Sequence, residues 1–265
     1  MRPFAVGGVM FDLFYQANLA ILYPIVFAAI FMMAELGILL GRMFRETQST
    51  ELGTFTGASL GLLALLLGFS FSLALSRYDA RRGWALEEAN AISSTANFAL
   101  MLPKQAQRPI LSLLRQYALI RRDLGIPYDP FKMNADIARS VEIQNTLWQQ
   151  ATQLSDDDTR SLAINRFINS LNEMNNVHER RLTALRYHVP YAVTFILMGV
   201  SMLVIGFTGY HVGITGARRH GSLLMMTLMV TAVIMLIVDL DRPARGLIQV
   251  PVTALEDALQ GMPVQ

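Results

Sequence analysis

One acidic residue, Glu35, lies well inside an apolar segment long enough to cross a membrane. A carboxylate inside a membrane span is energetically expensive, so such a residue is by default a candidate functional site. Glu35 precedes Arg42 by about 10 Å along a helix that rises about 1.5 Å per residue. Two interpretations stay open. Either Glu35 pairs with Arg42 or Arg45, or caps backbone groups of a neighbouring helix, or it handles protons or cations in transport.

The other reactive residue types offer little catalytic or metal-binding chemistry. The chain has no cysteine, which excludes disulfides, thiolate metal sites and a catalytic thiol. Its four histidines are scattered, and in the adjacent pair His178-Glu179 the side chains leave a helix on different faces. The acidic triplet at residues 156–158 lacks the glycine and distal glutamate of a calcium loop and fits a helix N-terminus better. The sequence therefore predicts no enzyme, no cofactor and no metal site.

A different kind of chemistry is suggested by residues 61–72. Leu65 and Phe69 are four residues apart on one helix face, with Gly61 one turn earlier and Ser72 about one turn later. If several copies of this helix surround an axis, that face forms an apolar constriction that can gate by dewetting. In a monomer the same face is ordinary packing, and the spacing alone does not decide between the two.

Basic residues follow this segment at the expected membrane boundary, where Arg77, Arg81 and Arg82 lie within about one helical turn of one another. They either anchor the helix beside anionic lipids or line the mouth of an anion pathway. Small residues precede them. Glycines four residues apart, which let membrane helices approach closely, occur as the pair Gly37 and Gly41 and as the series Gly53, Gly57 and Gly61.

The composition places these residues in an integral membrane protein. Of 265 residues, 53% are hydrophobic and 16% are charged, and the mean hydropathy is +0.38. A soluble domain carries about 25% charged residues. The net charge of +2 is small, which disfavours a nucleic-acid-binding surface. Four apolar runs approach the roughly 20 residues that span a bilayer and predict transmembrane helices at residues 19–41, 52–76, 188–210 and 222–240.

Arginines beside the spans predict the orientation. Nine of them lie on the side that holds both termini and the middle segment: Arg2, Arg77, Arg81, Arg82, Arg180, Arg181, Arg186, Arg242 and Arg245. Four lie in the short loops on the other side: Arg42, Arg45, Arg218 and Arg219. We therefore expect spans one and two in residues 1–76, a cytoplasmic domain at 77–187, spans three and four at 188–241, and a cytoplasmic tail at 242–265.

The middle segment is polar but carries helical periodicity throughout. Trp84, Ile92 and Phe98 recur at helical spacing without an intervening proline, so the second span is expected to continue as a long rod until Pro103. Further helices are predicted from Pro109 to about residue 124, over 131–154, and from about 159 toward the third span. With no strand pattern anywhere, the predicted fold class is an all-α membrane protein.

Two blocks of sequence resemble a bacterial membrane family that is called bestrophin-like. One is GFSFSLALSRYDARR at residues 68–82, continuing into Trp84 and EEANA at 87–91. The other is DLDRPARG at residues 239–246, whose signature positions are Asp239, Asp241, Pro243 and Gly246. Glu35 with Gly37 and Gly41, and NEM at 172–174, add to the likeness, which covers nearly the whole chain. The resemblance implies four spans with cytoplasmic ends in a bacterial inner membrane.

The chain is also similar, more distantly, to the bestrophins themselves, which are pentameric anion channels. Leu65, Phe69, Arg77 and Tyr78 reproduce the spacing of their pore helix. Two departures matter. Gly61 stands where a third bulky neck residue is expected, and residues 247–250 (LIQV) replace the acidic cluster that binds calcium in animal bestrophins. Calcium gating is therefore not expected.

The resemblance implies an oligomeric, chloride-type anion channel in which the second span lines the pore. Gly61, Leu65, Phe69 and Ser72 would form its neck, and Arg77 and Arg81 would attract anions at its mouth. Its partners would be further copies of the chain, in a homopentamer if bestrophins are the guide, together with membrane lipids and inorganic anions. Two alternatives remain: a non-conducting scaffold or sensor whose cytoplasmic domain binds a partner, and a proton or cation transporter that depends on Glu35.

Overall fold

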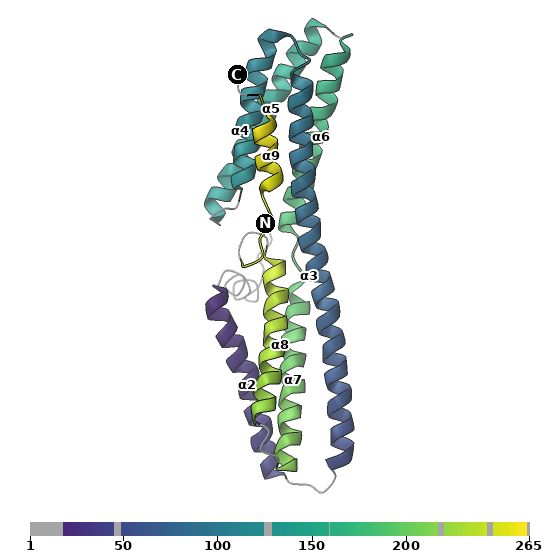
Figure 1. Cartoon of the computed structure of the whole chain (residues 1–265), viewed down its shortest axis with the longest axis vertical. Coiled ribbons are helices and arrows are strands. Elements are labelled where there is room, and N and C mark those ends of the chain that lie inside the picture. The colour runs from purple at the N-terminus through teal and green to yellow at the C-terminus, as the bar shows by residue number, and fades with distance from the viewer. Residues whose placement is uncertain are drawn as a thin grey trace, which may run out of the picture. The chain divides into compact units, whose positions relative to one another are not determined.

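The computed structural model describes residues 18–44, 49–124, 129–158, 160–216, 220–242 and 246–263. Within these ranges all regular structure is helical, which confirms the all-α prediction (Figure 1). The helices are α2 (Leu19–Met43), α3 (Ser49–Ala99), α4 (Lys104–Asp123), α5 (Pro130–Asp157), α6 (Leu162–Arg186), α7 (Tyr191–Thr215), α8 (His220–Asp241) and α9 (Thr253–Gly261).

Four of these helices, α2, α3, α7 and α8, are long and apolar enough to cross a membrane, which confirms the predicted number of spans. The third span begins at Tyr191, not at residue 188, because Pro190 occupies its N-cap. A proline at this end sets the backbone angle without removing a needed hydrogen bond. The helix ends at Thr215, where Gly216 adopts φ 66°, a left-handed conformation that glycine takes without strain.

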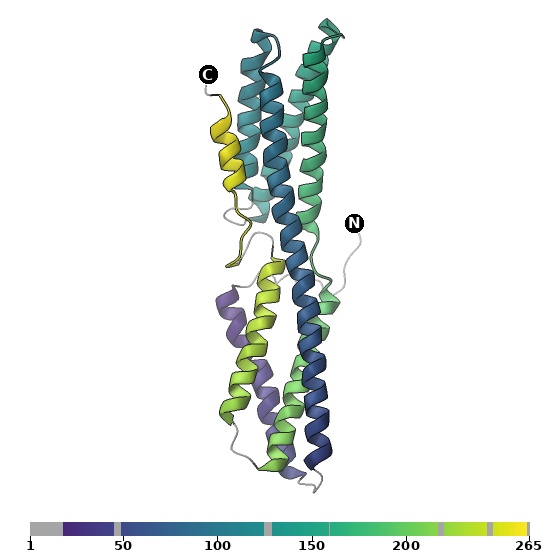
Figure 2. The same ribbon diagram turned by 45° about the vertical axis from the view of Figure 1, so that its right-hand side comes forward.

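The chain divides into two compact units, and α3 contributes to both. The membrane unit comprises residues 1–77 and 188–242, and the extramembrane unit comprises residues 78–187 and 243–265. In the membrane unit, α2 packs against α7 and α8, and α7 packs against α8 (Figures 1 and 2). The rings of Phe55 on α3 and Phe207 on α7 meet edge to face, with 5.0 Å between their centroids.

The contact between α2 and α7 depends on glycines from both helices. A Cβ atom added to Gly37 would overlap the backbone oxygen of Gly206, and one added to Gly209 would overlap that of Ala34. Gly41 is equally crowded, because a Cβ there would overlap the backbone oxygen of Tyr210. The predicted close packing of the Gly37 and Gly41 pair is therefore confirmed.

The extramembrane unit has a hydrophobic core to which α3, α4, α5, α6 and α9 all contribute. Its fully buried members include Ile92, Ile110, Leu114, Leu147, Phe167 and Leu171. The short helix α9, which the sequence reasoning did not predict, packs against α4 and buries Leu255, Ala258 and Leu259 (Figure 2). The C-terminal segment is thus part of this core.

Three expectations about helix ends were wrong. The acidic triplet at residues 156–158 lies at the C-terminal end of α5 and not at a helix N-terminus, because α6 begins only at Leu162 with Ser161 as its N-cap. The second extramembrane helix, α4, begins at Lys104 and not at Pro109, because Pro103 takes its N-cap. Pro109 is tolerated inside α4 because it and Gln105, whose carbonyl loses a helical donor, both lie on the exposed face where water can replace the bond. The helix α6 ends at Arg186 and does not run on into α7.

Candidate functional site

The predicted neck residues lie on one exposed face of α3 in the membrane unit. Leu65 is 54% exposed and Phe69 is 65% exposed, and Gly61 and Ser72 are exposed with them. The opposite face of this helix is buried and carries Leu63, Leu67, Ser70 and Ala74. Packing against the described residues therefore does not account for the Gly61–Ser72 face, which is left for lipid, for other subunits or for a pore.

The glycines of α3 differ from those of α2 and α7. A Cβ atom added to Gly57, Gly61 or Gly68 would meet nothing within 4 Å in the described part of the chain. At Gly53 an added Cβ would make only an ordinary contact, 3.6 Å from the His211 ring. The described part of the chain therefore does not provide the close packing that the tandem glycines predict.

The arginines that follow the neck are not equivalent. The side chain of Arg77 is partly exposed, whereas Arg81 is buried, with 2% of its surface exposed. Solvent access is needed at a channel mouth, so within one chain only Arg77 fits the expected role. At the other end of the middle segment, Arg180 lies over the Trp84 ring, 5.3 Å from its centroid, and Arg181 is buried.

Glu35 makes a contact that the sequence did not predict. Its Oε1 lies 3.4 Å from Nδ1 of His220, the first residue of α8. Arg45 lies outside the described residues, and Arg42 is exposed near the end of α2. The partner of Glu35 in the described residues is therefore a histidine from another helix, and the pairing with Arg42 or Arg45 stays a prediction.

The signature at the end of α8 connects two helix ends. Asp239 and Asp241 are buried, and Oδ1 of Asp241 accepts a hydrogen bond of 2.9 Å from the backbone N–H of Val189, just before α7. Gly246 has φ 131°, a backbone conformation that favours glycine. Pro243 lies outside the described residues. The acidic part of the signature thus ties the end of α8 to the start of α7.

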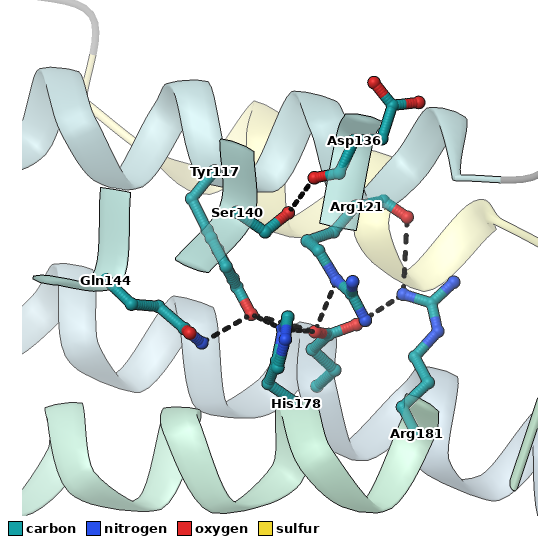
Figure 3. A network of polar contacts seen from close by, with 8 residues as sticks. Tyr117, Arg121, Asp136, Ser140, Gln144, His178 and Arg181 are labelled. Atoms are coloured by element: carbon teal, nitrogen blue, oxygen red, sulfur yellow. Dashed lines mark hydrogen bonds and ion pairs between the residues drawn. The ribbon is translucent and has the colours of Figure 1, made fainter. Parts of the chain in front are cut away.

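A buried polar network, which the sequence reasoning missed, lies inside the extramembrane unit (Figure 3). Its centre is the carboxylate of Glu88 on α3, which is fully buried. Oε1 of Glu88 accepts hydrogen bonds from Arg121 Nε at 2.7 Å and from the Tyr117 hydroxyl at 3.0 Å. Oε2 accepts a bond from Arg181 Nη1. One carboxylate therefore joins α3 to α4 and α6.

Burial and neighbouring charges determine the protonation of this network. Burial acts to raise the pKa of Glu88, but the charges of Arg121 and Arg181 outweigh it and lower that pKa to about 2. Burial, together with the charge of Arg121, lowers the pKa of His178 to about 4. Burial and then the Glu88 charge raise the pKa of Tyr117. At neutral pH, Glu88 is ionised while His178 and Tyr117 are neutral.

These protonation states assign the hydrogen-bond directions. Glu88 can only accept, so the Tyr117 hydroxyl donates its proton to Glu88. The Tyr117 oxygen then accepts from Nδ1–H of His178 at 2.9 Å and from the Gln144 amide at 3.3 Å. His178 is thereby assigned as the Nδ1–H tautomer. The network extends to α5 through Gln144 and holds four helices together.

The spacing of the charged and polar residues in the sequence gives some indication of this network, although the pattern of apolar residues alone does not. Tyr117 and Arg121 are four residues apart, and His178 and Arg181 are three apart, so each pair shares a helix face. Glu88 lies on the same face as the buried residues Ala85 and Ile92.

No group of three or more histidine or acidic side chains in the described ranges could hold a metal ion. The network's chemistry is therefore that of a buried ionic connection.

Comparison with known proteins agrees with this architecture. The sequence model of a protein family, the bestrophin-like domain, matches residues 22–255 of the chain. A bacterial bestrophin homolog from Klebsiella pneumoniae shares the fold: one structure of a single-site variant has a TM-score of 0.65 at 17% identity, covering 88% of this chain and 97% of that one. A second structure of that homolog has a TM-score of 0.62 at 16% identity, with the same coverage. No curated protein matches the chain. Because the domain match spans most of the sequence, the chain belongs to the bestrophin-like family.

Proposed function

We propose that the chain is one subunit of an oligomeric anion channel in which α3 lines the pore. The observation that carries this proposal is the exposed Gly61–Ser72 face of α3, which has no packing partner in the described chain. Membership of the bestrophin-like family supports a channel-type function at the level of the family. A homopentamer, the assembly of bestrophins, is the first arrangement to test.

The composition of this face favours a pore or a subunit contact over lipid. Lipid tails accept Leu65 and Phe69 readily, but Gly61 and Gly68 leave the backbone uncovered, and Ser72 adds a hydroxyl. Small residues are typical of helix contacts in membranes, and polar groups inside a membrane usually face protein or water. Rings of Leu65 and Phe69 from several subunits would form a constriction that water leaves readily.

The surroundings of the neck support anions as the permeating ions. Arg77 follows Phe69 by about two turns. It is partly exposed, so its charge would raise the local anion concentration. The excess of arginines on this side of the spans favours a cytoplasmic location for it. On this proposal the protein lies in a bacterial inner membrane, with the extramembrane unit and both termini in the cytoplasm.

Two measurements test the proposal. The mass of the detergent-solubilised complex should correspond to several subunits, and a monomer or dimer would exclude one α3 per subunit around a pore. In liposomes, Phe69→Ala should increase chloride flux because it removes a bulky apolar ring. Phe71→Ala is the matched control, since Phe71 lies on the other side of α3 and is less exposed. Unchanged flux in Phe69→Ala would refute the neck, and a reversal potential that follows the cation gradient would refute anion selectivity.

A second candidate is favoured by the contact between Glu35 and His220. Two titratable side chains 3.4 Å apart on membrane helices are suited to proton or cation coupling. A transporter of this kind should lose its activity in Glu35→Gln, whereas the proposed anion channel should keep its flux. A monomer without any flux would instead favour a scaffold or sensor.

A further inference from the structure

The buried network in the extramembrane unit contains more positive than negative charge. Its ionised groups are the carboxylate of Glu88 and the guanidinium groups of Arg121 and Arg181. Arginine keeps its charge throughout the physiological pH range. His178 and Tyr117 are neutral by the assignment given above. This network therefore has a net charge of one positive unit, which is costly unless something compensates it.

The uncompensated charge lies on the end of the Arg121 side chain. Arg121 is fully buried and uses Nε for its bond to Glu88. Its Nη1 and Nη2 are also buried, and neither has a hydrogen-bond partner among the residues that the structure describes. Arg181, by contrast, donates from Nη1 both to Glu88 and to the backbone oxygen of Arg121, the latter at 3.3 Å.

The network offers these nitrogens no second carboxylate. Both oxygens of Glu88 already accept hydrogen bonds. Asp136, the other acidic residue drawn in Figure 3, turns its carboxylate away from Arg121 and contributes only its backbone oxygen, which accepts from Ser140. Nε2 of His178 has no hydrogen-bond partner among the described residues, but this imidazole is neutral and cannot balance a charge.

We propose that Nη1 and Nη2 of Arg121 bind a small inorganic monoanion such as chloride inside the extramembrane unit. An anion would supply both the missing acceptor and the missing charge, because hydrogen bonds from a guanidinium to an anion are charge-assisted. A water molecule would supply only the acceptor. Arg121 is fully buried, so the anion must be small and must enter through local opening of the helices. This site is separate from the proposed neck and does not depend on conduction.

The test measures unfolding of the intact protein in detergent. Both tryptophans of the chain, Trp84 and Trp148, belong to the extramembrane unit, so their fluorescence reports the unfolding of that unit. Sodium chloride is exchanged for sodium gluconate at constant ionic strength. We expect the midpoint to rise with chloride and then to saturate, by about 4 °C when chloride is tenfold above its dissociation constant.

Variants separate this site from general salt effects. Arg121→Met removes the donors and the excess charge while keeping an unbranched side chain, and it should abolish the chloride dependence. Arg115→Met, which changes an exposed arginine on the same helix, should retain it. Equal midpoints in chloride and gluconate, or an unchanged chloride dependence in Arg121→Met, would overturn the proposal.

A measurement on the wild-type protein covers the case in which Arg121→Met does not fold. Crystals grown in sodium bromide should show an anomalous peak within hydrogen-bonding reach of Arg121 Nη1 or Nη2. Density at that position without anomalous signal would identify water and would refute the anion site, as would the absence of any peak.

Discussion

In the network of Figure 3, the Glu88 carboxylate forms ion pairs with both Arg121 and Arg181. Removal of its charge should therefore strongly destabilise the extramembrane unit. In Glu88→Gln the side chain keeps its shape and loses its charge, which leaves two guanidinium groups uncompensated. Removing one partner from a buried ion pair costs about 3–5 kcal/mol. We expect a loss of that size in the free energy of unfolding, with the midpoint falling by about 10–20 °C for a unit of this length.

Tryptophan fluorescence again provides the assay, because Trp84 and Trp148 both belong to the affected unit. Glu87→Gln is the matched control, since Glu87 is the neighbouring residue on α3 and is exposed. That variant should change the unfolding free energy by less than about 0.5 kcal/mol, as surface substitutions usually do. If Glu88→Gln lowers the midpoint no more than Glu87→Gln does, the account of the network as an ionic connection between α3, α4 and α6 is refuted.

A double variant tests whether the loss arises from uncompensated charge. In Arg121→Met, Glu88 keeps Arg181 as a single partner, so charge is balanced one to one. Glu88→Gln alone leaves the guanidinium groups of Arg121 and Arg181 without a carboxylate, and adding Arg121→Met removes one of these two charges. The combined loss should therefore be smaller than the sum of the two single losses, by about 1–3 kcal/mol. Additive losses would mean that the groups contribute independently.

Two further predictions concern pH and packing. The pKa of His178 lies at about 4 in the folded state and that of Glu88 at about 2, each below its usual value, so the unfolded chain binds more protons than the folded chain as pH falls. Stability should be complete above about pH 6.5 and should decline toward pH 2 by about 3 kcal/mol for each group. Fluorescence melts over this range should show the decline, and its part above about pH 5, where Glu88 does not yet contribute, should vanish in His178→Gln. In the membrane unit, Gly209→Ala should destabilise the contact of α7 with α2, since its Cβ would overlap the Ala34 carbonyl. Gly199→Ala on the same helix should be tolerated, because an added Cβ there would meet nothing within 4 Å in the described part of the chain. Equal proteolytic stability of these two glycine variants in detergent would contradict this reasoning.

Apolar length and proline positions made much of the fold predictable. The four spans follow from runs of about 20 apolar residues, a signal that needs no tertiary information. The continuation of α3 follows from the absence of proline before Pro103, which ends the rod as expected. The close packing of Gly37 and Gly41 also follows from spacing. The packing partner, however, is α7, and spacing alone did not identify it.

The features that the sequence reasoning missed depend on contacts between distant segments. The helix α9 has nine residues, too few to be stable alone, and forms against α4. Charged side chains usually lie on a solvated helix face. The residue types of Glu88, Arg121 and Arg181 therefore do not indicate that these side chains are buried. The partner of Glu35 comes from α8, far away in the chain. In each case the local sequence pattern predicts the helix but does not predict which distant segment packs against it.

The two sets of glycines in the membrane unit separate contacts made within the chain from contacts left for other molecules. Gly37 and Gly41 of α2 and Gly209 and Gly213 of α7 are used within the chain, because an added Cβ would overlap a neighbouring carbonyl. Those of α3 face outward next to Leu65 and Phe69, where the described chain provides no partner. Exposed leucine and phenylalanine alone would be compatible with lipid, whereas the uncovered backbone at Gly57, Gly61 and Gly68 is suited to a second helix or to a narrow pore. What covers this face of α3 is a question of assembly, which makes the subunit number the measurement on which the channel proposal depends most.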